Sequence, residues 1–171
     1  MDGWYSRSKP NSVKPVPWFA DNVIEAIEQI INKNYKVIEH GAGGSTLWFA
    51  DRVEFVMSFE NDPDWYRHLL KSIPNNVQLI FNNWPAVPDN WRPHGLFDLL
   101  VIDGEPVAER GEWITESPMI VKNKGYVILD NANRPEYELG RKFLHSISES
   151  VQTFDNNYGT QYLTTDICRL K

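Results

Sequence analysis

The chain has 171 residues, of which 42% are hydrophobic and 23% are charged, a balance that excludes a disordered or fibrous protein. Its net charge of −6 argues against a protein that binds duplex nucleic acid through the phosphates, because such proteins carry a basic surface. The only cysteine, Cys168, excludes an internal disulfide and favours a reducing compartment.

Residues 1–16 are polar and are interrupted by Pro10 and Pro15, so we expect them to form an N-terminal arm. We expect residues 17–171 to form a single domain, because about 150 residues are typical of one folding unit. No stretch of the sequence has the apolar length of a signal peptide or of a membrane span. The sequence therefore predicts a cytoplasmic protein that does not enter a membrane.

Helical and strand-like patterns alternate from residue 17 onward. Apolar residues from Trp18 to Ile31 recur at steps of three and four, which predicts a helix with one apolar stripe facing the core. The further predicted helices are residues 45–50, a helix that opens at Asp62-Pro63, residues 109–121 with a disturbance at Pro118, and residues 135–148. The predicted strands are residues 35–40, 53–60, 77–81, 96–103, 125–130, 151–154 and 162–170.

Nearly continuous apolar strands that alternate with helices are typical of a parallel sheet that is covered on both faces. The sequence therefore predicts an α/β protein with a Rossmann-like, doubly wound, mostly parallel sheet. Ligands of such sheets bind beyond the carboxyl ends of the strands. The candidate site residues are those that end the strands, and they include an unusual number of carboxylates.

A glycine-rich turn, residues 41–44, directly follows the first predicted strand and opens a helix. Glycine permits a tight turn and lets a ligand contact the backbone, while the free N–H groups of a helix start face that ligand. Glu60 ends the next strand, where a carboxylate can accept the hydroxyls of an adenosine ribose. The turn and the acid together predict a site for an adenosine-containing cofactor.

Residues 37–46 resemble the first motif of class I S-adenosylmethionine-dependent methyltransferases. Glu39 matches the acid two positions before the first glycine of that motif, and Glu60 matches the acid that binds the ribose. Residues 99–104 resemble the fourth-strand motif, and residues 125–131 resemble the fifth strand of small O-methyltransferases. The resemblance implies a seven-stranded sheet whose C-terminal strand is antiparallel.

The same resemblance implies that S-adenosyl-L-methionine is the cofactor and that the protein transfers a methyl group to a small-molecule acceptor, at oxygen. The expected cofactor-binding residues are Glu39, Gly41, Gly43, Ser45, Glu60, Asn83 and Asp103. Asn83 is included because the segment after the third strand lacks the Asp that the family often has near the adenine.

Two residues are predicted to be catalytic and two to bind the substrate. Asp103 matches the family residue near the transferred methyl group, and His40 is a candidate base, with a packed or solvated histidine as the alternative. Arg110 and Arg134 follow the fourth and fifth strands, where they can clamp an anionic substrate or pair with neighbouring glutamates.

Asp103, Asp130 and Asn131 end two strands that should be neighbours, and they resemble the metal-binding set of catechol-type O-methyltransferases. Hard cations such as Mg²⁺ or Ca²⁺ take such oxygen ligands. A metal that lowers the pKa of the acceptor, or a base, would remove the proton of an oxygen acceptor. The alternative is that Asp130 and Asn131 only cap a helix or form a turn.

Two other functions fit part of the pattern. An NAD-dependent oxidoreductase would use the same turn and acid, although Thr46 stands where its fingerprint has a third glycine. A non-catalytic, methyltransferase-like binding subunit is the second, because the short chain has little room for an inserted substrate domain. As partners we expect a small-molecule substrate and no nucleic acid, and the seven Trp residues are compatible with a dimer.

Overall fold

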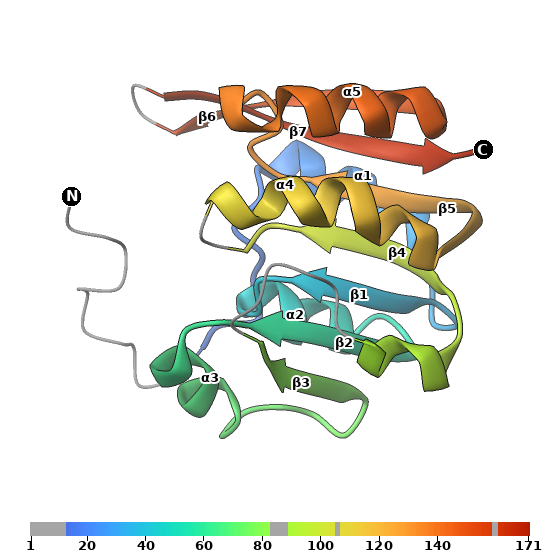
Figure 1. Cartoon of the computed structure of the whole chain (residues 1–171). Helices are drawn as coiled ribbons and strands as arrows, with labels where there is room; N and C mark the ends of the chain where they lie inside the picture. Colours follow the sequence, from blue (N-terminus) through green and yellow to red (C-terminus); the bar gives the residue numbers. More distant parts are fainter. Residues whose placement is uncertain (1–12, 83–88, 105–106, 159–160) are drawn as a thin grey trace.

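The computed structural model describes residues 13–82, 89–104, 107–158 and 161–171. Seven strands form one sheet in the order β3-β2-β1-β4-β5-β7-β6 (Figure 1). The strands are β1 (Lys36–His40), β2 (Phe55–Glu60), β3 (Val77–Phe81), β4 (Phe97–Ile102), β5 (Val121–Leu129), β6 (Ser148–Tyr158) and β7 (Gln161–Leu170). The pairs among β1 to β5 are parallel, and β7 is antiparallel to both of its neighbours, so the predicted fold class is confirmed.

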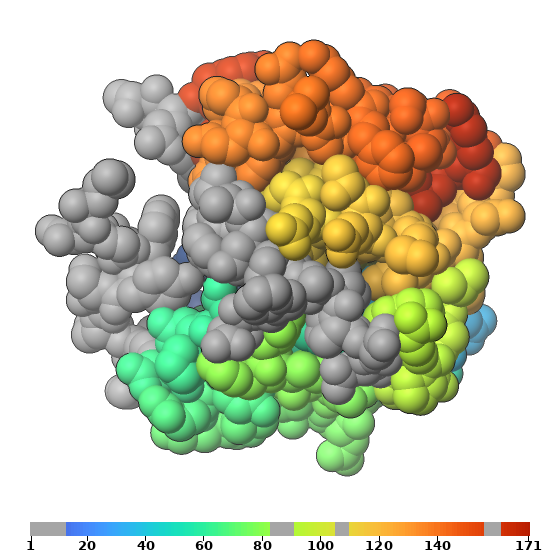
Figure 2. Space-filling view, in the orientation of Figure 1, coloured from blue at the N-terminus to red at the C-terminus, as the bar shows by residue number. Residues whose placement is uncertain are grey.

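Helices cover both faces of this sheet. The α-helices are α1 (Asp21–Ile30), α2 (Gly44–Ala50), α3 (Pro63–Leu69), α4 (Val107–Glu116) and α5 (Glu138–Ile147), and the 3₁₀ helices are η2 (Asp89–His94), η3 (Ser117–Ile120) and η4 (Pro135–Tyr137). One hydrophobic core lies between α1, α2 and one face of the sheet. A second hydrophobic core lies between α4, α5 and the opposite face. Figure 2 shows α4 and α5 forming a continuous surface over that second face. Within the described ranges, every helix is too short or too polar to cross a membrane.

The strand ladder continues past the strand ends and aligns the loops at the carboxyl edge of the sheet. The N–H of Gly41 donates to the carbonyl of Phe59 at 3.0 Å, and the N–H of Asp103 donates to the carbonyl of His40 at 2.9 Å. The N–H of Asp130 reaches the carbonyl of Ile102 at 3.2 Å. The loops that follow β1, β4 and β5 therefore start side by side, at the left edge of the sheet in Figure 1.

The first helix is shorter than its apolar stripe predicts. Ala20 is the N-cap of α1, and Trp18 lies before the helix with 73% of its surface exposed. A core position for Trp18 is therefore wrong: its neighbour Phe19 turns into the core and is 5% exposed. By contrast, Asp62 caps α3 as predicted, because its side chain accepts the N–H groups of Asp64 and Trp65.

Candidate functional site

The loops after β1 and β4 pack against each other backbone to backbone. Gly41 has a φ of +97°, a left-handed conformation that favours glycine. A Cβ at position 41 would lie 2.5 Å from the Cα of Gly104, and a Cβ at position 104 would lie 2.7 Å from the ring of His40. Neither glycine therefore has room for a side chain, and the two loops hold each other in place.

The glycine turn leaves one of its positions open. A Cβ at Gly43 would meet no atom of the described residues within 4 Å, so this backbone faces open space. Gly44 is covered instead, because a Cβ there would lie 2.6 Å from the carbonyl oxygen of Lys14. A ligand can therefore approach the backbone of the turn at Gly43.

Glu39 supports the turn from beneath. Its fully buried carboxyl accepts the hydroxyls of Thr46 at 2.6 Å and Ser58 at 2.8 Å, and also that of Ser45. Burial raises the pKa of Glu39, while the three hydroxyls oppose that rise. The Thr46 hydroxyl accepts the N–H of Gly43 at 2.9 Å. Glu39 and Ser45, both expected to bind the cofactor, thus bind each other and fix the shape of the turn.

The carboxyl of Glu60 faces the glycine turn. Its Oε1 accepts the N–H groups of Asn61 at 2.9 Å and Asp62 at 2.7 Å, and the backbone of Ala42 lies near enough to help lower its pKa. The side chain is 7% exposed, and this burial raises the pKa of Glu60 to about 7 against the opposing backbone hydrogen bonds. The acid at the end of β2 and the turn after β1 therefore form one arrangement.

Arg110 joins the ends of β4 and β5 from α4. Its guanidinium donates to the Asp103 carbonyl at 2.6 Å, to Asp103 Oδ1 at 3.2 Å and to the Asp130 carbonyl at 3.0 Å. Its Nε also donates to the carbonyl of Gly104. The side chain is 2% exposed, so the predicted substrate ligand is turned inward and braces the loops that carry Asp103 and Asp130.

The carboxyls of Asp103 and Asp130 lie close to each other beside this brace. Burial, and then the Asp130 carboxyl, raise the pKa of Asp103 well above its ordinary value, while Arg110 opposes the rise. Asp130 Oδ1 accepts the hydroxyl of Thr165 at 2.6 Å. The Asp103 side chain keeps 26% of its surface exposed, so it can reach a ligand at this edge.

The structure gives no support to the predicted metal set of Asp103, Asp130 and Asn131. Asp103 Oδ1 is bound to Arg110, and Asp130 Oδ1 is bound to Thr165. Asn131 is 7% exposed and has a φ of +53°, a turn conformation that asparagine tolerates. Among the residues that the structure describes, no group of three His, Cys, Asp or Glu side chains is placed to hold a metal ion.

His40 is packed beneath the site. Its ring stacks on Trp113 with a centroid distance of 4.3 Å, and the residue is 6% exposed. Burial, and then the charge of Arg110, lower the pKa of His40 to about 3. The imidazole is therefore neutral at physiological pH, and so weak a base contributes little to the removal of a hydroxyl proton.

Two predicted site residues remain, and one further residue at the site was not predicted. Arg134 is half-buried in the turn after β5, where its N–H donates to the carbonyl of Asn131 at 3.0 Å. Asn83, predicted near the adenine, lies outside the described residues. Trp65 was missed by sequence reasoning: its indole N–H donates to the carbonyl of Ala42 at 2.8 Å, and only its place three residues after Asp62 hinted at a fixed position.

No family model and no curated protein matches this sequence. Precorrin 8W decarboxylase from Methanobacterium thermoautotrophicum is similar in structure, with a TM-score of 0.65 and 21% identity over 96% of each chain. An rRNA methylase from Streptococcus thermophilus matches with a TM-score of 0.66 and 10% identity, over 91% of this chain and all (100%) of that one. An N-methyltransferase from Bradyrhizobium japonicum, in complex with S-adenosyl-L-homocysteine, matches with a TM-score of 0.65 and 10% identity, over 88% of this chain and 87% of that one. At these identities the likeness establishes a shared fold, which is that of S-adenosylmethionine-dependent methyltransferases.

Proposed function

We propose that this protein is an S-adenosylmethionine-dependent methyltransferase. The observation that carries the proposal is the place of the buried Glu60 carboxyl at the end of β2, beside the glycine turn, whose Gly41 N–H donates to the carbonyl of Phe59 at 3.0 Å. A buried acid at the end of β2 can accept the ribose hydroxyls of an adenosyl ligand, while the open backbone at Gly43 admits the rest of it. The solved structures of the same fold include one in complex with S-adenosyl-L-homocysteine, which supports the same cofactor here.

The chemistry proposed for the site is alignment and proton removal. When bound, S-adenosylmethionine supplies a methyl group on a positively charged sulfur. Residues that strongly stabilised this positive charge would favour the ground state over the transition state. The residues therefore contribute mainly by fixing the two reactants, an effect worth up to roughly 7–11 kcal/mol in favourable systems. We assign to Asp103 the holding of the acceptor and the removal of its proton, and the partial exposure of its side chain supports this role.

The acceptor proposed is a small molecule that reacts at oxygen. The fifth-strand resemblance to small O-methyltransferases and the carboxyl group of Asp103 support an oxygen acceptor. An rRNA methylase shares the fold, so the absence of a nucleic-acid partner stays a prediction, which the net charge of −6 supports. Transfer of a labelled methyl group to a panel of phenols and sugars, with total RNA as a separate arm, distinguishes the two acceptor classes.

Calorimetry with S-adenosyl-L-homocysteine tests the cofactor. We expect micromolar binding by the wild type and binding at least about tenfold weaker by Glu60→Ala, because the ribose hydroxyls lose a charged hydrogen-bond acceptor. The absence of binding at millimolar ligand would contradict the proposal. A thermal-shift comparison with NAD provides the control. Stabilisation by NAD alone would favour an oxidoreductase, which Thr46 argues against because its side chain fills the place of the third glycine.

A further inference from the structure

A chain of hydrogen bonds joins the β2–α3 turn to the glycine turn. Glu60 Oε1 accepts the N–H of Asp62 at 2.7 Å, and Asp62 Oδ1 accepts the N–H of Trp65 at 2.6 Å. The indole Nε1–H of Trp65 donates to the carbonyl of Ala42 at 2.8 Å. Trp65 is therefore the link by which α3 holds the glycine turn.

We propose that Trp65 is a positioning residue for the cofactor, which it serves by fixing the peptide plane between Ala42 and Gly43. This plane is held at both ends: Trp65 donates to the carbonyl oxygen of Ala42, and the hydroxyl of Thr46 accepts the N–H of Gly43. The open backbone at Gly43 is thus oriented before any ligand arrives.

The indole donor is itself held rigidly. Asp62 caps α3, Pro63 is the first residue of the helix, and the Asp62 side chain fixes the backbone of Trp65. The Trp65 ring stacks against His68 with a centroid distance of 5.4 Å and an interplanar angle of 27°. The half-buried indole therefore presents its N–H to the carbonyl of Ala42. Ala42 is only 7% exposed, and a buried carbonyl needs a hydrogen-bond partner.

Pre-ordering of the turn has a consequence for affinity. A turn that is already in its bound shape avoids the ordering cost that a mobile turn meets when the ligand binds. Removal of the indole N–H should loosen the plane that carries Gly43 and weaken the cofactor affinity about 3- to 10-fold, the range of one net hydrogen bond. This role rests on the proposed function, since it concerns the same cofactor.

The test compares Trp65→Phe, which keeps an aromatic ring and loses the N–H, with Trp91→Phe. Trp91 is in η2. The carbonyl of His94, in the same helix, accepts Lys36 Nζ near the start of β1, so this control lies at the edge of the sheet opposite the glycine turn. Trp91 is also partly buried against the core, which makes the loss of packing comparable. For both variants we would measure S-adenosyl-L-homocysteine affinity by calorimetry, urea unfolding, and the ¹⁵N amide spectrum of the ligand-free protein.

The expected result is a 3- to 10-fold weaker affinity for Trp65→Phe and an unchanged affinity for Trp91→Phe, at similar losses of unfolding free energy. In the ligand-free Trp65→Phe protein, the amide signals of Ala42 and Gly43 should broaden, and ligand should sharpen them again. If Trp65→Phe bound the ligand with the same affinity as Trp91→Phe, the proposed role of Trp65 would be wrong and the proposed function would still stand. A wild type that binds no S-adenosyl-L-homocysteine would overturn the proposed function together with this role.

Discussion

Glu60 combines a position suited to ribose binding with a pKa near neutrality. Burial raises the pKa of this carboxyl to about 7 from an ordinary value of 4.5. A ribose hydroxyl donates best to the ionised carboxylate, so the affinity for S-adenosyl-L-homocysteine should rise as the pH passes upward through 7. We expect binding about tenfold weaker at pH 6 than at pH 8, measured by calorimetry at constant ionic strength.

Glu60→Gln supplies the control for this pH dependence, because its amide keeps an acceptor oxygen and does not titrate. Its affinity should be weaker than that of the wild type at pH 8 and nearly constant down to pH 6. The free energy of unfolding depends on pH in the opposite direction to the affinity. A carboxyl whose folded-state pKa is raised binds more protons when folded, so its contribution to stability declines as the pH rises from about 4.5 to about 7. A wild-type affinity that does not change with pH would contradict the assignment.

Arg110 and His40 show why residue type alone is a weak guide to a role. Both lie in or beside loops at the carboxyl edge, where a charged or titratable residue is often a ligand. Burial decides their actual contacts: Arg110 is 2% exposed and binds strand-end carbonyls, and His40 stacks on Trp113. Neither contact has a signal in the sequence, because both depend on how α4 packs against the sheet.

At the scale of the element, the glycine turn offers a direct comparison between two of its own residues. Gly41→Ala should lower the free energy of unfolding by about 2–4 kcal/mol, because φ is +97° and the new Cβ would lie 2.5 Å from Gly104. Gly43→Ala meets no described atom within 4 Å and should cost less than about 1 kcal/mol. Urea unfolding of the ligand-free proteins checks both values, and equal losses would mean that the two loops do not touch as described.

Much of the sheet and part of the site could be predicted from the sequence because they depend on local patterns. Apolar runs located β1, β2, β3 and β4, and the glycines with the acid of Glu60 located the cofactor edge. β6 is longer than predicted, since it runs from Ser148 to Tyr158 where only residues 151–154 have a strand-like pattern. Its polar end is held by pairing with β7, a contact between distant residues that periodicity does not record. The link from Trp65 to Ala42 escaped prediction for the same reason.

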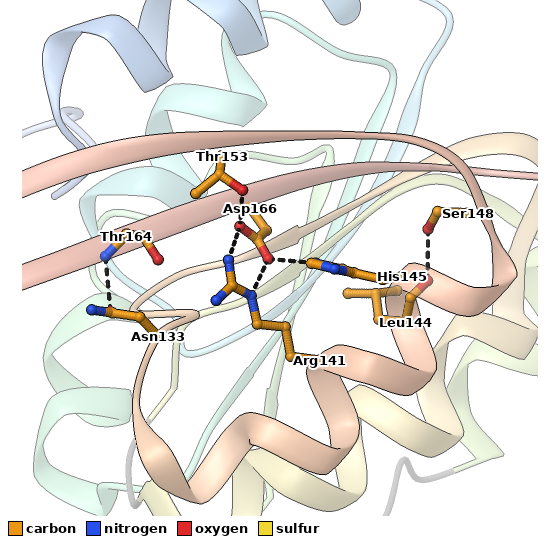
Figure 3. Close-up of polar contacts among 8 residues, drawn as sticks. All are labelled: Asn133, Arg141, Leu144, His145, Ser148, Thr153, Thr164 and Asp166. Carbon is orange, nitrogen blue, oxygen red and sulfur yellow. Dashed lines mark hydrogen bonds and ion pairs between the residues drawn. The ribbon is translucent and has the colours of Figure 1, made fainter.

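At the scale of the whole molecule, a network centred on Asp166 attaches α5 to the last two strands (Figure 3). Asp166 lies on β7 with no exposed surface and accepts two hydrogen bonds from Arg141, at 2.6 and 2.9 Å. It also contacts His145 Nε2 at 2.7 Å and accepts the hydroxyl of Thr153 on β6 at 2.7 Å. One buried carboxylate thus joins a helix and two strands. These three elements are far along the chain from the glycine turn.

Asp166→Asn should therefore destabilise the whole fold rather than the cofactor site. Burial alone would raise the pKa of Asp166, but the hydrogen bonds from Arg141, Thr153 and His145 outweigh it and hold the pKa below its ordinary value. A carboxyl of this kind stabilises the fold above its unfolded-state pKa and loses that contribution as the pH falls through its folded-state pKa. We expect the free energy of unfolding to fall by about 3 kcal/mol at pH 7. This is the lower end of the range for a broken buried ion pair, because Arg141 is 27% exposed and partly screened by solvent.

Asp155→Asn is the matched control, since Asp155 is exposed on β6 and accepts only the hydroxyl of Tyr162 among the hydrogen bonds described for it. Its loss should stay below about 0.5 kcal/mol in the same urea titration. The difference between the two variants should shrink as the pH falls below the ordinary Asp value of 3.8 and through the still lower pKa of Asp166. Equal losses at pH 7 would show that α5 is attached by its apolar contacts, such as Leu144 in the core, and that the network adds little.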